Sequence, residues 1–296
     1  MKNCLIILMA IVCTVLPSCN EDVCRFADPL VGTADNGHTF PGACVPFGMV
    51  QPSPDSGNDE WKYCSGFNIA DSTLIGFSQT HLNGTGCSDM GDVLILPFCT
   101  ESPERDNPYV KESLKAFPGY CSVSFCNGID VEMTATQRVA QYSIHYADTA
   151  PRRLLVDLQN GMVNGPENLH FHVYEADVEY PDEYTVQGRL VTKNWVRREW
   201  YFVLKFSEPY LSRTILDKEP REKADRTVFD FAESNDCLGV KIALSTVGTA
   251  GALAAMNAEA EGWDFGKVRK EAHAKWHALL SKVEVKGSAE QKKNIY

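Results

Sequence analysis

The order of apolar and polar residues is most regular between residues 93 and 247. Apolar residues recur there at period two in stretches that are rich in β-branched and aromatic residues and are separated by turn-forming residues. The stretches are VLILPF, YCSVSFCNGIDVEMTATQRVAQYSIHYA, RRLLVDLQN, LHFHVYEADVEY, YTVQGRLV, REWYFVLKFS, TVFDFAE and CLGVKIALSTV. No stretch of helical length interrupts them. The pattern therefore predicts a mainly β, antiparallel two-sheet β-sandwich and disfavours a parallel sheet with crossover helices.

Residues 24–92 have a different composition, dominated by Gly, Pro and small polar residues. The stretch DPLVGTADNGHTFPGACVPFGMVQPSPDSGNDEWKYCSGFN is typical of it. Such a composition predicts turns and short strands in place of helices. We expect this segment to join the strands that follow in one N-terminal β-sandwich domain over residues 24–249.

Helical spacing of apolar residues begins near residue 250. The stretch GALAAMNAEAEGWDFGKVRKEAHAKWHALLSKVEV predicts a short helix and then a longer one, which begins after an N-cap at Asp264 and ends near Lys282. One apolar stripe on the longer helix is formed by Trp276, Leu279, Leu280 and Val283. We interpret residues 250–285 as a helical linker.

The last residues, SAEQKKNIY, predict the first turn of another helix, because Ser288 and Gln291 have the spacing of a capping box. We expect residues 286–296 to be the start of a truncated helical domain, and the chain to be part of a longer protein.

The N-terminus, MKNCLIILMAIVCTVLPSCN, has one lysine and a short apolar run, as a signal peptide does. The run is too short to span a bilayer comfortably. Leu16-Pro17-Ser18-Cys19 resembles a bacterial lipobox, so residues 1–19 are expected to form a signal peptide with lipidation at Cys19. The alternative is an ordinary secretory signal in which Cys19 is incidental. We expect an exported protein, held to a membrane only through a lipid anchor.

Composition narrows the choice of partners. The chain of 296 residues is 44% hydrophobic, enough for a substantial core, and carries a net charge of −11. This charge argues against nucleic acid or an anionic membrane surface as a partner. Eight cysteines remain after residue 19, and export permits disulfides between them, with buried free thiols as the alternative. These cysteines are Cys24, Cys44, Cys64, Cys87, Cys99, Cys121, Cys126 and Cys237.

The stretch TLIGFSQTHLNGTGCSDMGDVLILPF, residues 73–98, concentrates polar residues between glycines. Two interpretations of it stay open. His38, His81, Asp89 and Asp92 could converge on a metal ion, although the full calcium-loop pattern is absent. The favoured interpretation is that they cap turns and strand ends through hydrogen bonds. A nucleotide-binding loop is excluded because no Gly-Lys-Ser/Thr follows, and no hydrolase signature surrounds His81 and Cys87.

A carbohydrate site needs aromatic faces beside hydrogen-bonding groups on rigid loops. The WKYCSGF stretch supplies Trp61, Tyr63 and Phe67 close in sequence to the histidine-bearing segments. The residues alone do not decide whether Trp61 contacts a sugar or belongs to the core.

Three motifs carry a family resemblance. DPLVGTADNGHTFPGACVPFGMVQPSPD, WKYCSGFN and STLIGFSQTHLNGTGCSDMGDVLILP resemble the opening of glycoside hydrolase family 92, the exo-acting α-mannosidases, and GWDFGKVRKEAHAKWHALLSKVEVKGSAEQKKNIY is similar to the family's linker helices. The resemblance implies an N-terminal β-sandwich joined by helices to a C-terminal (α/α)6 barrel.

The resemblance also implies a calcium-dependent, inverting exo-α-mannosidase that acts on mannose-containing glycans through α-1,2 or related linkages. Its catalytic carboxylates and calcium ligands belong to the C-terminal domain, so no catalytic or metal-binding residue is expected in this chain, which we expect to be inactive alone. Trp61 matches the aromatic residue of the leaving-group subsite. Four further residues are expected near the substrate: Thr33, His38, His81 and Asp89. The alternative is a stand-alone carbohydrate-binding surface lipoprotein.

Three positions depart from the family pattern. Gln79 replaces a common His, Asn83 replaces a Ser, and Phe67 replaces a Tyr. These departures leave open which glycosidic linkage is cut, but they do not weaken the resemblance to the family. The implied location is the periplasm or the cell surface of a Gram-negative bacterium.

Overall fold

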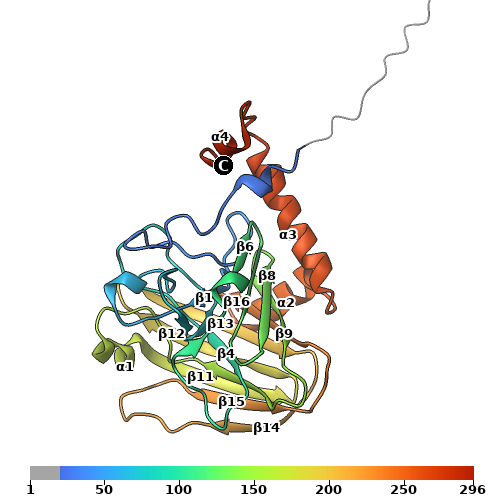
Figure 1. The fold of residues 1–296 in the computed structure, drawn as a ribbon. Coiled ribbons are helices and arrows are strands. Elements are labelled where there is room, and N and C mark those ends of the chain that lie inside the picture. Colours follow the sequence, from blue (N-terminus) through green and yellow to red (C-terminus); the bar gives the residue numbers. More distant parts are fainter. Residues whose placement is uncertain (1–20) are drawn as a thin grey trace, which may run out of the picture.

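A computed structural model describes residues 21–296 and contains two facing antiparallel sheets (Figure 1). The six-stranded sheet has the order β1 (Ser53–Asp55), β3 (Gly76–Ser78), β4 (Leu94–Phe98), β10 (Arg152–Asp157), β15 (Arg226–Phe231), β14 (Tyr210–Ile215). The eight-stranded sheet has the order β11 (Val173–Asp182), β12 (Thr185–Lys193), β13 (Arg197–Phe206), β16 (Leu238–Ser245), β9 (Val139–His145), β8 (Asp130–Ala135), β7 (Tyr120–Ser124), β6 (Lys115–Phe117). A short pair, β2 (Thr73–Leu74) and β5 (Asn107–Pro108), lies apart from both.

The core fills the space between the two sheets. The ring of Phe77 on β3 lies 6.3 Å from that of Tyr142 on β9, and Phe206 on β13 lies 5.1 Å from Phe229 on β15. All four side chains are at most 2% exposed. Burial of such aromatic residues supplies the main stabilisation of the sandwich, about 25 cal/mol for each Å² of apolar surface. The predicted mainly β sandwich is confirmed.

Two details of the predicted strands are wrong. The stretch from residue 169 was expected to be extended from its start, but Leu169–His172 forms the short helix α1, which follows the 3-10 turn η4 (Pro166–Asn168). The proline at the start of that turn and the burial of His172 favour the helical conformation. The edge strand β14 was not predicted, because nearly all its residues are exposed and show no alternation.

The segment before β4 folds as short strands and turns, as its composition predicts. It holds η1 (Val23–Phe26), η2 (Trp61–Tyr63) and strands of two or three residues. Several of its non-glycine residues adopt positive φ, among them His38 at 51° and Val93 at 56°. Such backbone is uncommon for β-branched or bulky residues and marks a segment whose shape is set by its surroundings.

Of the three helices at the C-terminal end, the first two pack along one side of the sandwich, and the last contacts η1 (Figure 1). The three helices are α2 (Thr249–Glu259), α3 (Phe265–Leu280) and α4 (Ala289–Lys293); a further 3-10 turn, η3, spans Lys111–Ser113. The Asp264 N-cap and the capping box of Ser288 with Gln291 are confirmed. Helix α3 ends two residues before the expected Lys282.

Helix α3 docks through a close backbone approach. Trp276 donates from Nε1 to the carbonyl oxygen of Cys44 at 2.6 Å, and Ala272 is 1% exposed. A Cβ atom built on Gly119 would lie 2.8 Å from the Cβ of Ala272. The predicted stripe residue Val283 lies beyond the helix and is 57% exposed. The contact with the sandwich is therefore made by the turns around Ala272 and Trp276.

The cysteines that the structure describes, from Cys24 to Cys237, are all free thiols. Burial raises the pKa of Cys44 to about 11 and that of Cys121 to about 12. Within residues 21–296, none of the helices has the length and apolar character needed to cross a membrane. The predicted signal peptide and the Cys19 lipidation site lie outside the described residues.

The docking of α3 predicts unequal effects of two glycine substitutions. Gly119 and Gly84 both have positive φ, 86° and 69°, but only Gly119 faces another element; nothing lies within 4 Å of a Cβ at Gly84. Gly84→Ala is expected to cost about 1 kcal/mol through backbone strain alone. Gly119→Ala is expected to cost about 2–4 kcal/mol, because the added methyl also overlaps α3. Urea unfolding measures both. Equal losses would contradict close packing of α3 on Gly119.

Candidate functional site

The polar stretch singled out in the sequence, residues 79–92, joins the two sheets at one end of the sandwich; we name it the bridging segment. Its backbone doubles back on itself: Gln79 N donates to Asp92 O at 3.0 Å, and Gly91 N donates to Thr80 O at 2.8 Å. An isolated bridge pairs His81 with Met90. The side chains of the segment then reach elements on both sides of it.

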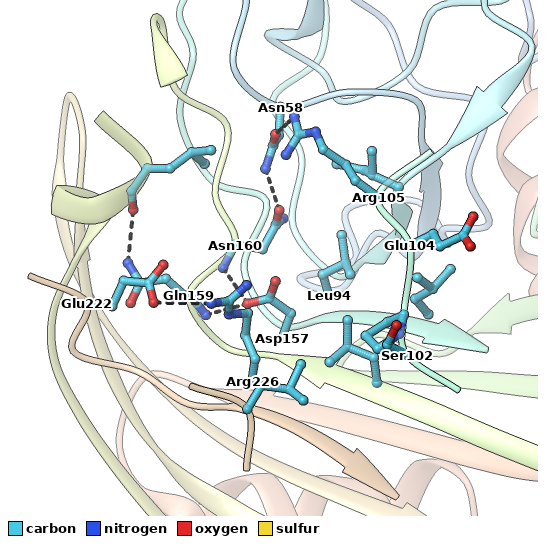
Figure 2. Close-up of a pocket in the computed structure, with 16 residues that line it drawn as sticks. Asn58, Leu94, Ser102, Glu104, Arg105, Asp157, Gln159, Asn160, Glu222 and Arg226 are labelled. Atoms are coloured by element: carbon cyan, nitrogen blue, oxygen red, sulfur yellow. Dashed lines mark hydrogen bonds and ion pairs between the residues drawn. The ribbon is translucent and has the colours of Figure 1, made fainter. Parts of the chain in front are cut away.

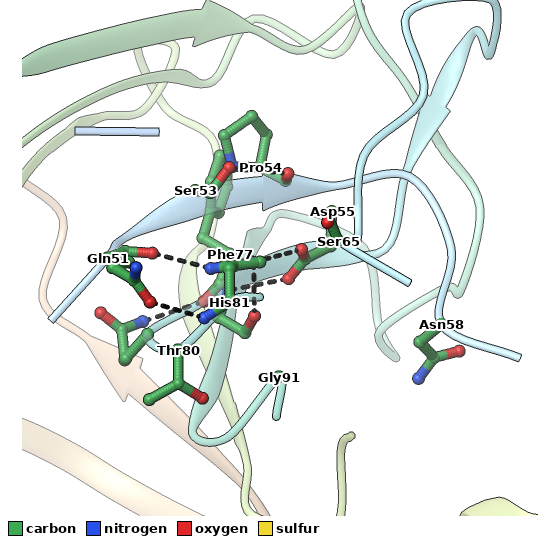
Figure 3. Close-up of polar contacts among 12 residues, drawn as sticks. Gln51, Ser53, Pro54, Asp55, Asn58, Ser65, Phe77, Thr80, His81 and Gly91 are labelled. Atoms are coloured by element: carbon green, nitrogen blue, oxygen red, sulfur yellow. Dashed lines mark hydrogen bonds and ion pairs between the residues drawn. The ribbon is translucent and has the colours of Figure 1, made fainter. Parts of the chain in front are cut away.

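His81 attaches the bridging segment to the six-stranded sheet (Figure 3). Its Nδ1 lies 2.8 Å from the carbonyl oxygen of Gln51, and its Nε2 lies 2.8 Å from Oδ1 of Asp55 on β1. Because a carbonyl can only accept, Nδ1 is the donor in the bond to Gln51. The side chains of His81 and Asp55 are completely buried. The pair is a fully enclosed structural contact.

Asp92 is a second buried carboxylate. It accepts from Thr80 Oγ1 at 2.7 Å, and its Oδ1 lies 3.5 Å from Nε2 of His172 on α1. Burial alone would raise the pKa of Asp92, but His172, Thr80 and Arg198 together hold this pKa below its usual range. Asp92 is therefore an ionised anchor between the bridging segment and α1.

Asp89 attaches the bridging segment to the eight-stranded sheet. Arg198 on β13 donates from Nη1 to Oδ2 of Asp89 at 2.9 Å and from Nη2 to Oδ1. Val196 N also donates to Oδ2, at 3.2 Å. The Asp89 side chain is 3% exposed and that of Arg198 is 15% exposed. A two-pronged, buried guanidinium–carboxylate pair of this kind fixes geometry as well as charge.

The three departures from the family pattern lie in different environments. Gln79 is fully buried, donates to Phe77 O at 3.0 Å and accepts from the Tyr142 hydroxyl at 3.0 Å. Phe67 is 2% exposed. Only Asn83 lies at the surface. In this structure, the surface available to a ligand therefore differs from the family pattern mainly at Asn83.

Trp61 is exposed beside the bridging segment. Its Nε1 donates to Gly86 O at 2.7 Å, and 47% of the residue's surface is accessible. The ring of His38 meets it edge-on at 4.5 Å, and His38 is itself 6% exposed. Thr33 is buried and closes a turn by donating to Leu30 O at 2.8 Å. Trp61 is thus a surface aromatic on a held loop, whereas its sequence neighbours Tyr63 and Phe67 are buried.

The five expected site residues fall into two groups. Trp61 offers surface to a ligand, while Thr33, His38, His81 and Asp89 are each at most 6% exposed. Of the four residues considered as metal ligands, His81, Asp89 and Asp92 take part in separate hydrogen-bonded sets, and His38 packs on Trp61. Substrate contact by any of the five stays a prediction.

A second exposed tryptophan beside the bridging segment was not predicted. Trp195 lies at the turn between β12 and β13 and is 69% exposed. The preceding Asn194 donates from Nδ2 to Ser88 O and, at 3.0 Å, to Met162 O. The sequence signal is an aromatic residue inside a short turn between two strands, Lys-Asn-Trp-Val.

The Asp89–Arg198 pair predicts a large stability coupling. Asp89→Ala leaves a buried guanidinium without its carboxylate and is expected to cost about 3–5 kcal/mol of unfolding free energy. The double variant Asp89→Leu with Arg198→Met is expected to recover much of this loss. Chemical denaturation of Asp89→Leu, Arg198→Met and the double variant measures the coupling. Arg189→Met, which breaks an exposed cluster, is the control and is expected to cause a much smaller loss. Additive effects at Asp89 and Arg198 would contradict the pairing.

Comparison with known proteins gives two family matches. Residues 26–245 match the glycosyl hydrolase family 92 N-terminal domain, and residues 251–296 match the glycosyl hydrolase family 92 catalytic domain. An uncharacterized secreted glycosidase of Arthroderma benhamiae is 38% identical over 136 residues, which cover 42% of this chain and 17% of that protein.

Solved structures agree with the sequence matches. A family GH92 α-mannosidase from Bacteroides thetaiotaomicron, in complex with mannoimidazole, aligns with a TM-score of 0.84 and 25% identity over 92% of this chain and 39% of that one. A family GH92 inverting mannosidase from Bacteroides thetaiotaomicron VPI-5482 shares the fold, with a TM-score of 0.76 and 24% identity over 93% of this chain. The chain spans about two fifths of the length of each structure, 39% and 38%.

The first family match covers most of the chain and coincides with the two-sheet sandwich, and the second coincides with the helices that follow it. This chain belongs to glycosyl hydrolase family 92.

Proposed function

We propose that this chain is the N-terminal part of an exported, calcium-dependent, inverting exo-α-mannosidase that trims mannose-rich glycans at α-1,2 or related linkages. Family membership supports a glycoside hydrolase, and the α-mannosidase structure that aligns at 25% identity supports mannosides as the substrate class. The secreted relative supports export. The sandwich would act as the part of the enzyme that shapes and holds the substrate site.

The observation that carries this proposal is the exposed face of Trp61 on a rigid support. A tryptophan ring can stack on the apolar face of a sugar, while nearby backbone groups bond its hydroxyls. Trp61 is held by Gly86 and His38, and the bridging segment beneath it is anchored to both sheets. A ring fixed in this way loses little conformational entropy when a sugar binds.

The catalytic carboxylates are proposed to come from catalytic-domain sequence outside this chain. Inversion needs two carboxyl groups about 6.5–9.5 Å apart, with room for a water molecule between them and the sugar. The carboxylates near the bridging segment are Asp55, Asp89 and Asp92, and all three are buried beside a histidine, arginine or hydroxyl partner. They suit a supporting role, because carboxyl groups that are buried and already bonded to protein cannot reach a substrate as proton donor or base.

The same division applies to calcium. Ca²⁺ takes six to eight oxygen ligands. Within residues 21–296, the one group of His, Cys and carboxylate side chains close enough to share an ion is Asp22, Cys24 and His273, whose thiol and imidazole do not fit calcium. We propose that the calcium ligands come from sequence outside this chain.

We further propose that Cys19 carries lipid and anchors the enzyme at the periplasmic or outer face of a Gram-negative cell. The 3-10 turn η1, which follows Cys19 closely in the sequence, packs against α3. The membrane would then tether the enzyme near glycans at the cell surface.

The proposal predicts that the 296-residue chain is inactive by itself. Purified chain with calcium is expected to release no product from aryl-α-mannoside or mannobiose, because the acid and base are elsewhere. A Trp61→Ala preparation purified in parallel controls for host contamination. Turnover by the wild-type chain that persists through a second purification step and is lost in a variant of one of its carboxylates would overturn this division of roles.

The alternative function is a stand-alone carbohydrate-binding surface lipoprotein, which the exposure of Trp61 and Trp195 favours. Calorimetric titration with mannose oligosaccharides separates the two. The enzyme proposal predicts weak binding, since one part of the site is absent. Binding at Kd of about 1 μM or tighter that is lost in Trp61→Ala would favour the alternative.

A further inference from the structure

A separate cavity of about 350 Å³ lies over β4 and β10 of the six-stranded sheet (Figure 2). The floor of the cavity is formed by residues that are paired across β4 and β10: Leu96 lies opposite Leu155, and Leu94 lies opposite Asp157. The intervening Ile95 pairs with Phe77, whose ring contacts Tyr142 of the other sheet. Because side chains alternate along a strand, the floor lies on the outer face of the sheet, away from the sandwich core.

One wall of this cavity carries opposite charges. Arg226 on β15 is the cross-strand partner of Asp157, so both lie on the same outer face. Oδ1 of Asp157 accepts from Gln159 N at 2.8 Å and Asn160 N at 3.1 Å, and no donor in residues 21–296 reaches Oδ2. Arg226 donates from Nη2 to Asp217 O at 3.1 Å and more weakly to Glu222. The wall therefore combines a free carboxylate oxygen with a guanidinium that has N–H groups to spare.

The wall is rigid, because its amide side chains bond to protein. Arg105 donates to Asn58 Oδ1 at 2.7 Å, Asn58 donates to Asn160 Oδ1 at 2.6 Å, and Asn160 donates to Gly91 O at 2.7 Å. Figure 2 shows the first two of these bonds, from Arg105 to Asn58 and from Asn58 to Asn160, along the upper side of the cavity. The cavity is thus preformed, and the chain of bonds fixes it to the end of the bridging segment.

The pKa of Asp157 is raised to about 6, mainly by burial and to a smaller extent by nearby Glu222. The backbone N–H groups of Gln159 and Asn160 and the guanidinium of Arg226 act in the opposite direction and lower this pKa. The charged groups that face Asp157 or its partners are Arg226, Glu222, Glu104, Arg105 and His170. At neutral pH the carboxyl is mainly ionised, and an additional hydrogen-bond donor would stabilise that form.

The charged and apolar residues that line the cavity indicate which class of ligand it can bind. Carboxylates beside the guanidinium disfavour an anion, and the guanidinium disfavours a metal ion, so the ligand is neutral. A free acceptor beside free donors, above a floor of Leu94, Leu96 and Leu155, suits adjacent hydroxyls on a ring that has an apolar face. We propose that this cavity is a second carbohydrate site, which binds a neutral monosaccharide independently of Trp61.

Proton–nitrogen NMR of the 296-residue chain tests this site with mannose and glucose as probes. Titration is expected to shift the amides of Leu96, Asp157, Asn160 and Arg226, with Kd on the order of 1–10 mM, as suits a ligand of this size. Asp157→Asn keeps the acceptor for the backbone N–H groups and is expected to weaken binding about tenfold. Trp61→Ala is expected to leave the shifts unchanged.

A second variant covers the case in which Asp157→Asn unfolds. Ser102→Trp adds a ring at the exposed rim of the cavity and is expected to abolish the shifts while thermal unfolding stays near that of wild type. Three results would overturn the proposal. The first is the absence of any shift in the folded wild-type chain at sugar concentrations on the order of 100 mM. The second is the loss of the shifts in Trp61→Ala. The third is that the free amino acids glycine or alanine shift the same amides with a lower Kd than the sugars. None of these bears on whether the chain belongs to an α-mannosidase.

Discussion

Buried polar pairs at one end of the sandwich hold the rest of the structure in place. His81 with Asp55 and Asp89 with Arg198 connect residues 79–92 to opposite sheets, and Asp92 connects them to α1. A buried charge without a partner destabilises a fold by several kcal/mol, so each of these groups constrains the position of the element that carries its partner. The loop therefore has little freedom to move, although its glycine content suggests flexibility.

This constraint explains how a loop-rich segment can support a binding surface. The positive φ angles of Met90 at 69° and Val93 at 56° are tolerated only where surrounding contacts fix the backbone. Trp61 bonds to this segment at Gly86, and Asn194, the neighbour of Trp195, bonds to it at Ser88. The two exposed rings thus inherit the rigidity of the buried pairs. The outer-face cavity shares the support, since Asn160 bonds to Gly91.

Much of the fold could be predicted from the sequence, because strands with one buried face alternate visibly. Strand β14 escaped prediction since neither of its faces is buried, and α1 escaped because its apolar pattern suits a strand equally well. The site was harder. His81 and Asp89 have the residue types of a catalytic or metal centre, and only the structure shows their buried partners Asp55 and Arg198, 26 and 109 positions away. The exposure of Trp61 likewise depends on tertiary packing that no local pattern reports.

The central claim, that buried pairs make the 79–92 segment part of the core, is tested most directly by hydrogen–deuterium exchange with mass spectrometry. The backbone amides of Gln79 and Gly91 donate to Asp92 O and Thr80 O. Peptides that contain these amides are predicted to exchange as slowly as peptides from β9 and β13, because exchange requires opening of the whole sandwich. The exposed residues 217–221 provide the fast reference. Exchange of the segment at the rate of that reference would contradict the account.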